Sequence, residues 1–203
     1  MGTENHKHLS VVQPKVAQVL QRNLGTELEL DWIRTIRVNR SAVERRANTL
    51  TKRRSIKNEW QAAWLLRAIT LIDLTTLAGD DTPGKVERLC AKAVKPVASQ
   101  TLNELGFIDR QITVGAVCVY HSMLSTALRS LSGTGIPVAA VSAGFPTGLA
   151  SLDTRIREVE ISVANGASEI DIVINRAHVL TGNWQALYEE IKCFREACGE
   201  AHL

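Results

Sequence analysis

The hydrophobic pattern of this chain changes character near Leu71. From there to the C-terminus, short apolar runs alternate with segments in which apolar residues recur at helical spacing. The apolar runs predict strands over residues 71–76, 114–120, 138–142 and 169–175. Four strand and helix units in succession predict a parallel sheet, closed or open, covered by helices.

The predicted strand over 169–175 has two faces that make opposite chemical demands. Its aliphatic face is formed by Ile170, Ile172 and Ile174. The other face carries Glu169, Asp171, Val173 and Asn175. Parallel strands between helices are normally covered on both faces, so the carboxylates are expected to face an enclosed polar interior. Barrels of parallel strands have such an interior at their C-terminal mouth, where active sites lie.

The residues before Leu71 follow a different pattern. Residues 1–24 are polar and are expected to form a flexible extension. Residues 25–70 show helical spacing in several stretches, and in the last of these Trp60, Trp64 and Leu65 lie at core-facing positions. The two tryptophans are interpreted as packing anchors. The predicted organisation is therefore an extension (1–24), a helical segment (25–70) and four β/α units (71–203).

Composition and charge narrow the class of protein. The chain has 203 residues, of which 45% are hydrophobic, which suffices for one domain with a sizeable core. Its net charge of +3 favours neither nucleic acid nor a membrane surface as a partner. The basic residues Arg45, Arg46 and Lys52 to Arg54 are interpreted as the solvated face of a helix. A cytoplasmic location is expected, because no apolar run is long enough for a membrane span or a signal peptide.

The cysteines do not suggest a metal site. Cys90, Cys118, Cys193 and Cys198 have no CxxC spacing and no histidine arrangement typical of zinc. They are interpreted as reduced thiols, and no metal or cofactor is expected.

Small and polar side chains collect on one face of several predicted strands when the two-residue alternation is applied. These inward candidates are Asp73, Thr75, Cys118 and Asp171. Such a lining is typical of a small polar pocket rather than of a hydrophobic ligand cavity.

Each candidate also has a purely structural interpretation. Asp73 can cap the loop after its strand, and Thr75 is a common strand former. Cys118 is interpreted as a small buried hydrophobe, since no activating base adjoins it in the sequence. Asp171 is the strongest functional candidate, because an inward aspartate in an aliphatic strand costs stability unless it is paired.

Four segments, in order and with the right separations, resemble deoxyribose-phosphate aldolase, particularly its animal form. They are residues 71–77 (LIDLTTL), 116–120 (AVCVY), 143–146 (AGFP) and 169–175 (EIDIVIN). The resemblance runs from about Gly25 to Leu203. It implies the N-terminal half of a (β/α)8 TIM barrel with extra N-terminal helices, because a whole barrel needs about 250 residues.

The resemblance also implies an activity. The family cleaves 2-deoxy-D-ribose 5-phosphate reversibly to glyceraldehyde 3-phosphate and acetaldehyde, without a metal, through a Schiff base on a lysine. Asp171 matches the family aspartate that relays protons with a second lysine. Asp73, Thr75 and Cys118 match positions that line the sugar phosphate, with Asp73 and Thr75 suited to hydroxyl contacts.

Two departures from the family pattern stand out. The Schiff-base lysine, its partner lysine and the phosphate-binding loops belong to the second half of the family's barrel, and no lysine here, including Lys192, matches them. The 203-residue chain is therefore expected to be an inactive fragment of the enzyme. His121 stands where the family commonly has proline, which concerns the local turn.

Other interpretations stay open. The chain is alternatively a non-catalytic short product that binds a full-length subunit or associates with itself, since a half-barrel has two open strand edges. Another sugar-phosphate barrel enzyme is the further alternative.

Overall fold

The computed structural model describes residues 25–53, 56–107 and 111–203. The expected N-terminal extension, residues 1–24, lies outside this part of the chain. The described residues form a parallel sheet in the order β1-β2-β3-β4. Its strands are β1 (Asp73–Thr75), β2 (Ala116–Tyr120), β3 (Val138–Ser142) and β4 (Glu169–Ile172). All three pairings are parallel, as the alternating pattern predicted.

The strand order continues past β4. The amide of His202 donates to the carbonyl of Ser168 at 2.9 Å, and the amide of Ile170 donates to the carbonyl of His202 at 2.8 Å. Together they form a parallel bridge between Glu169 and His202. The chain therefore begins another ladder on the free side of β4.

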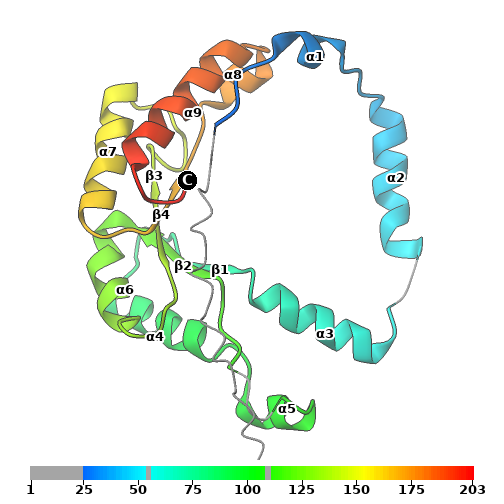
Figure 1. The fold of residues 1–203 in the computed structure, drawn as a ribbon, viewed down its shortest axis with the longest axis vertical. Helices are drawn as coiled ribbons and strands as arrows, with labels where there is room; N and C mark the ends of the chain where they lie inside the picture. The colour runs from blue at the N-terminus through cyan, green and yellow to red at the C-terminus, as the bar shows by residue number, and fades with distance from the viewer. Residues whose placement is uncertain (1–24, 54–55, 108–110) are drawn as a thin grey trace, which may run out of the picture.

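Helices cover one face of the sheet (Figure 1). The main ones are α4 (Pro83–Val94), α6 (Leu124–Ser130), α7 (Leu152–Ala164) and α9 (Trp184–Cys198). Shorter elements are α5 (Ser99–Glu104), η1 (His121–Met123) and α8 (Arg176–Leu180). The core between sheet and helices includes Val117, Val119, Ile170 and Phe194, all at most 1% exposed. Burying these apolar side chains stabilises the two-layer arrangement.

Local sequence explains how α4 starts and which face it buries. Pro83 occupies the first turn, where its missing N–H leaves no hydrogen bond unmade. Thr82 caps the helix, because its hydroxyl oxygen accepts a hydrogen bond from the amide of Lys85 at 3.4 Å. Val86, Cys90 and Ala93 follow at helical spacing and are buried against the sheet.

The packing of the N-terminal helices differs from the prediction. They are α1 (Leu30–Thr35), α2 (Arg40–Arg53) and α3 (Asn58–Ile69), and α2 and α3 reach away from the sheet in Figure 1. The core-facing assignment of Trp60, Trp64 and Leu65 is wrong, because these side chains are 66%, 62% and 59% exposed. Only Leu66 of α3 is buried. The helical pattern identified an apolar face of α3, but few of the described residues pack against that face.

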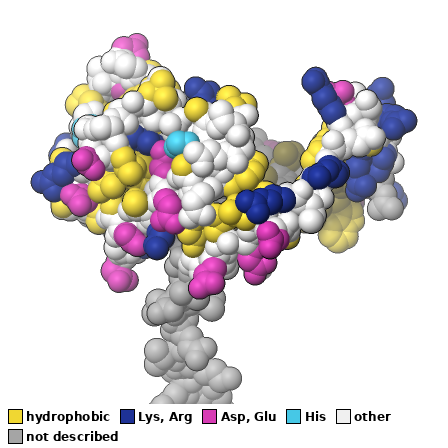
Figure 2. All heavy atoms as spheres, turned by 90° about the horizontal axis from the view of Figure 1, so that it is seen from above, with side chains coloured by type: hydrophobic (Ala, Val, Ile, Leu, Met, Phe, Trp, Pro, Cys, Tyr) yellow, Lys and Arg dark blue, Asp and Glu magenta, His cyan; other side chains and the backbone are white. Residues whose placement is uncertain are grey.

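The described part of the basic run lies on a solvated helix, as predicted, while Arg54 lies outside the described residues. None of the side chains of α2 is buried, and Arg45, Arg46, Lys52 and Arg53 are exposed. Figure 2 shows the corresponding lobe, on the right of the view, dominated by Lys and Arg. Among the described helices, none is both long and apolar enough to cross a membrane.

A glycine allows the loop after β3 to approach the end of β4. Gly148 has φ +66°, and a Cβ built on it would lie 3.0 Å from the carbonyl oxygen of Ile174 and 3.1 Å from that of Val173. Both oxygens are backbone atoms, which cannot swing aside as a side chain does. Gly133 has a similar φ of +77° but open space around it.

These two glycines form a matched pair for mutation. Gly133→Ala is expected to cost about 1 kcal/mol, the penalty for a left-handed L-residue alone. Gly148→Ala is expected to cost clearly more, because the clash with the end of β4 adds to that penalty. Urea unfolding followed by circular dichroism measures both; equal losses would show that the loop moves away without cost.

Candidate active site on the inner face of the sheet

The inner face of the sheet carries the predicted site residues. Cys118 is 1% exposed and packs with Ala139 and Val141 of β3, while Leu77 and Tyr120 border this small cluster. The alternation is confirmed, because Val117 and Val119, the neighbours of Cys118, belong to the core on the helix side. The expected enclosure is not present in the described residues, where Asp171 is half-buried and Asp73 is exposed.

Cys118 and Asp171 meet across the sheet. The Sγ of Cys118 on β2 donates a hydrogen bond to Oδ2 of Asp171 on β4, at 3.0 Å. Burial, this hydrogen bond and the negative charge of Asp171 raise the pKa of Cys118 far above the usual value for a thiol. Cys118 is therefore a protonated donor rather than a nucleophilic thiolate. Sequence reasoning found no partner for it because the two residues are 53 positions apart.

Asp73 belongs to the same polar group. Partial desolvation of its carboxyl group, followed by the charge of Asp171, raises the pKa of Asp73, while His202 acts in the opposite direction. Asp73, Asp171, Glu169 and His202 line a cavity of about 360 Å³, together with Leu71 and Gly115, which precede β1 and β2. The beginning of the additional ladder thus brings a histidine beside two predicted site residues.

Thr75 lies in register with Cys118, its partner in the β1–β2 pairing. Its hydroxyl donates to the backbone carbonyl of Asp73 at 2.8 Å. This bond is local to β1, so the hydroxyl oxygen still has lone pairs to accept a further hydrogen bond. The structure therefore brings all four predicted residues to one face, with Cys118 and Asp171 in direct contact.

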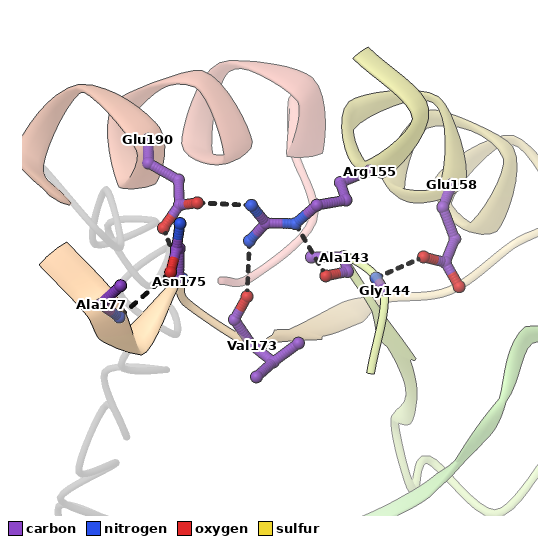
Figure 3. Close-up of polar contacts among 8 residues, drawn as sticks. All are labelled: Ala143, Gly144, Arg155, Glu158, Val173, Asn175, Ala177 and Glu190. Carbon is purple, nitrogen blue, oxygen red and sulfur yellow. Dashed lines mark hydrogen bonds and ion pairs between the residues drawn. The ribbon is translucent and has the colours of Figure 1, made fainter. Parts of the chain in front are cut away.

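Figure 3 shows a second polar cluster, which joins the ends of β3 and β4. The Arg155 side chain on α7 is 3% exposed. Its Nε donates to the carbonyl of Ala143 at 2.9 Å, and its Nη2 donates to the carbonyl of Val173 at 2.7 Å. Its Nη1 pairs with Oε1 of Glu190 on α9 at 2.5 Å. One guanidinium therefore holds the residues that follow both strands.

Glu190 completes this cluster. Its Oε2 accepts the amide of Asn175 at 2.9 Å, and the Oδ1 of Asn175 accepts the amide of Ala177 at 3.0 Å, capping α8. The Arg155 guanidinium also lies 4.9 Å from the ring centre of Phe194. These bonds explain why β4 ends at Ile172 rather than at residue 175, since the following backbone groups bond to side chains instead of to β3.

The sequence contains a local signal for this cluster. Arg155 lies four residues before Val159, and Glu190 lies four residues before Phe194, so each charge falls on the buried face of its helix. A charged residue in an apolar helical stripe is expected to have a buried partner.

The loop after β3 is tied down by α7 as well. Ala143 and Gly144 both have positive φ, 62° and 74°, and the amide of Gly144 donates to Oε2 of Glu158 at 2.8 Å. The other oxygen of Glu158 lies 3.6 Å from Nδ1 of His121. His121, the departure from the family pattern, thus begins the turn η1 and faces the helix that holds the next loop.

Breaking the Arg155 cluster should destabilise the fold. Arg155→Met leaves Glu190 buried without its cation and removes two backbone contacts, so we expect a loss of about 3–5 kcal/mol in the free energy of unfolding. Arg157→Met, which removes the exposed pair with Glu160, should change it by less than about 0.5 kcal/mol. Urea unfolding of both variants tests the difference, and equal effects would contradict a structural role for the cluster.

The raised pKa of Asp73 predicts a pH dependence. A raised pKa means that folding opposes ionisation, so stability falls as pH rises from the unfolded pKa through the folded one. Asp73→Asn should therefore gain stability relative to the original chain at about pH 7, and this gain should shrink at about pH 3, where aspartates are protonated in both states. Unfolding curves at the two pH values measure the gain; a constant difference would refute the coupling.

The comparisons with known proteins agree with this geometry. The model of the DeoC/LacD family aldolases matches residues 67–203. The chain is 55% identical over 183 residues to deoxyribose-phosphate aldolase from Homo sapiens. The aligned region covers 89% of this chain and 58% of the human protein. The corresponding Mus musculus protein is 55% identical over 181 residues, covering 88% and 57%. The chain thus spans somewhat more than half the length of these relatives.

Solved structures support the fold. A Coccidioides immitis protein assigned as a deoxyribose-phosphate aldolase superposes with a TM-score of 0.55 at 29% identity, over 67% of this chain and 47% of its own. The aldolase QR15 superposes with a TM-score of 0.51 at 24% identity, over 66% of this chain and 52% of its own, which bears on the fold alone. The described residues thus form part of an α/β barrel of the TIM type, and the chain belongs to the DeoC/LacD family of aldolases, with deoxyribose-phosphate aldolases as its close relatives.

Proposed function

We propose that this chain supplies the first four β/α units of a deoxyribose-phosphate aldolase. The reaction is the reversible cleavage of 2-deoxy-D-ribose 5-phosphate to D-glyceraldehyde 3-phosphate and acetaldehyde. The observation that carries the proposal is the inner-face group of Asp73, Cys118 and Asp171, in which Cys118 bonds directly to Asp171 at 3.0 Å. The 55% identity to the human enzyme supports the choice of substrate.

Asp171 is the proposed proton relay. Retro-aldol cleavage requires a proton to leave the hydroxyl next to the breaking carbon–carbon bond and another to reach the released carbon. A half-buried carboxylate beside a water-accessible cavity can accept and return these protons through water. Asp73 and Thr75 are proposed to bind substrate hydroxyls, and Cys118 lines the site beside Asp171.

The nucleophile is proposed to come from polypeptide other than these 203 residues. Class I aldolases form a Schiff base between a lysine and the substrate carbonyl, which accepts the electrons released on cleavage. The four described strands contain no lysine. Lys85 pairs with Asp80 and Asp81, and Lys192 lies on α9 in the helix layer. We therefore propose that the chain alone does not turn over substrate.

A second candidate is a non-catalytic product that binds a full-length subunit in the cytosol. The exposed Trp60 and Trp64 of α3 favour it, because large apolar side chains gathered on one element often mark a contact surface. Co-purification with the full-length enzyme, lost on Trp60→Gln and Trp64→Gln, separates this candidate from the first.

Borohydride trapping tests where the nucleophile lies. Incubating the chain with 2-deoxy-D-ribose 5-phosphate and borohydride should produce no covalent adduct in the intact mass. The same chain, fused at Leu203 to the remaining part of the human enzyme, should gain one adduct on a lysine of the added part. An adduct on Lys85, Lys192 or any other lysine of this chain would overturn the proposal.

The fusion also tests the relay. Asp171→Asn should lower kcat by about 100-fold or more, because an amide cannot carry the proton, while KM changes much less. Asp153→Asn is the matched control, since Asp153 is an exposed aspartate in the first turn of α7. Equal turnover in the two variants would assign Asp171 a structural role. Turnover only with a different sugar phosphate would replace the proposed substrate.

A further inference from the structure

The thiol of Cys118 has a partner and a position that the proposed reaction does not yet use. It lies in the centre of β2, 1% exposed, with apolar neighbours on its own face. Its one proton points at a carboxylate two strands away. A buried cysteine that served only as a small hydrophobe would not need this bond.

We propose that Cys118 is a positioning residue, whose thiol holds the carboxylate of Asp171 in a single orientation on the inner face of the sheet. The catalytic meaning of this inference depends on the proposed function, but the hydrogen bond itself does not.

The geometry of β3 makes the contact possible. Ala139 pairs with Cys118 on one side and with Glu169 on the other, so β3 lies between the two partners. Ala139 is fully buried on the same face as Cys118, and its methyl group leaves room above the strand. Asp171 is in register with Val141, two residues further along β3, so its contact with Cys118 crosses β3 diagonally. Side chains from alternate strands meet in a similar way in the layers of a barrel interior.

The chemistry of the pair favours a fixed donor. A thiol is a weak donor towards neutral acceptors, but its bond strengthens when the acceptor is a carboxylate. The raised pKa of Cys118, caused first by burial, keeps the proton on sulfur across the physiological range. Among the described residues Asp171 receives no other hydrogen bond. Oδ2 is thus held by the thiol, and Oδ1 is left for water and substrate.

Infrared spectroscopy of the 203-residue chain tests the bond directly, because the S–H stretch lies in a window free of other protein bands. We expect one S–H band displaced to lower wavenumber. It should vanish in Cys118→Ala and move back to higher wavenumber in Asp171→Asn, in which the acceptor is neutral. Cys90→Ala removes another buried thiol and should leave the displaced band unchanged.

A second readout follows the carboxylate. The chain is labelled with ¹³C at Cγ of its aspartates and studied by NMR. The carboxyl signal of Asp171 is assigned by its loss in Asp171→Asn. It should be a single narrow line in the original chain and in Cys118→Ser, where a hydroxyl replaces the donor. In Cys118→Ala it should shift and broaden, while the other aspartate signals stay in place.

The outcomes are separable from those of the aldolase assay. A displaced S–H band with a narrow Asp171 signal that depends on a donor at position 118 supports the inference, whatever the turnover of the fusion. A band at the position of the other thiols, or an Asp171 signal unaffected by Cys118→Ala, overturns it even if Asp171 proves to be the proton relay.

Discussion

The hydrogen bonds of the buried Arg155 guanidinium are the interactions on which the arrangement of this molecule depends. Taking a guanidinium and a carboxylate out of water is costly, and the cost is offset only when every donor finds a partner. Here each nitrogen of the guanidinium donates a hydrogen bond, to the carbonyl of Ala143, the carboxylate of Glu190 or the carbonyl of Val173. Two helices and two strand ends therefore meet at one guanidinium, and a shift of any of the four would leave a buried charge or a buried N–H donor without its partner.

Two polar clusters thus act on β4 from different places. The thiol of Cys118 contacts it on the inner face, at Asp171, and the guanidinium contacts the backbone two residues later, at Val173. The first sets the orientation of a side chain, and the second sets the path of the chain that carries it. Precise catalytic geometry generally requires both kinds of support, because a well-oriented side chain on a loose backbone is still misplaced.

The sequence correctly predicted features that depend on the local hydrophobic period. The predictions failed where contacts between residues distant in the sequence determine the structure. The bounds 138–142 of β3 agree with the structure, and so does the division of the strands into an aliphatic and a polar face. The end of β4 was placed too late, because its backbone bonds to Arg155 and Glu190, which no local pattern reveals. The core-facing prediction for Trp60 was wrong for a similar reason, since periodicity identifies an apolar face but not which residues cover it. The Cys118–Asp171 contact was missed because it joins distant positions.

The strand order has a consequence for how the molecule is made. Each of the strands β2, β3 and β4 pairs with the strand synthesised just before it, and the bridge at His202 continues the same order. Each β/α unit can therefore dock on a finished neighbour as it leaves the ribosome, with a short loop to close and no earlier strand to wait for. The Arg155–Glu190 pair can close only after α9 has emerged, because Glu190 lies 35 residues after Arg155, whereas β3 and β4 can pair before then. This part of the barrel can thus assemble by addition at one growing edge.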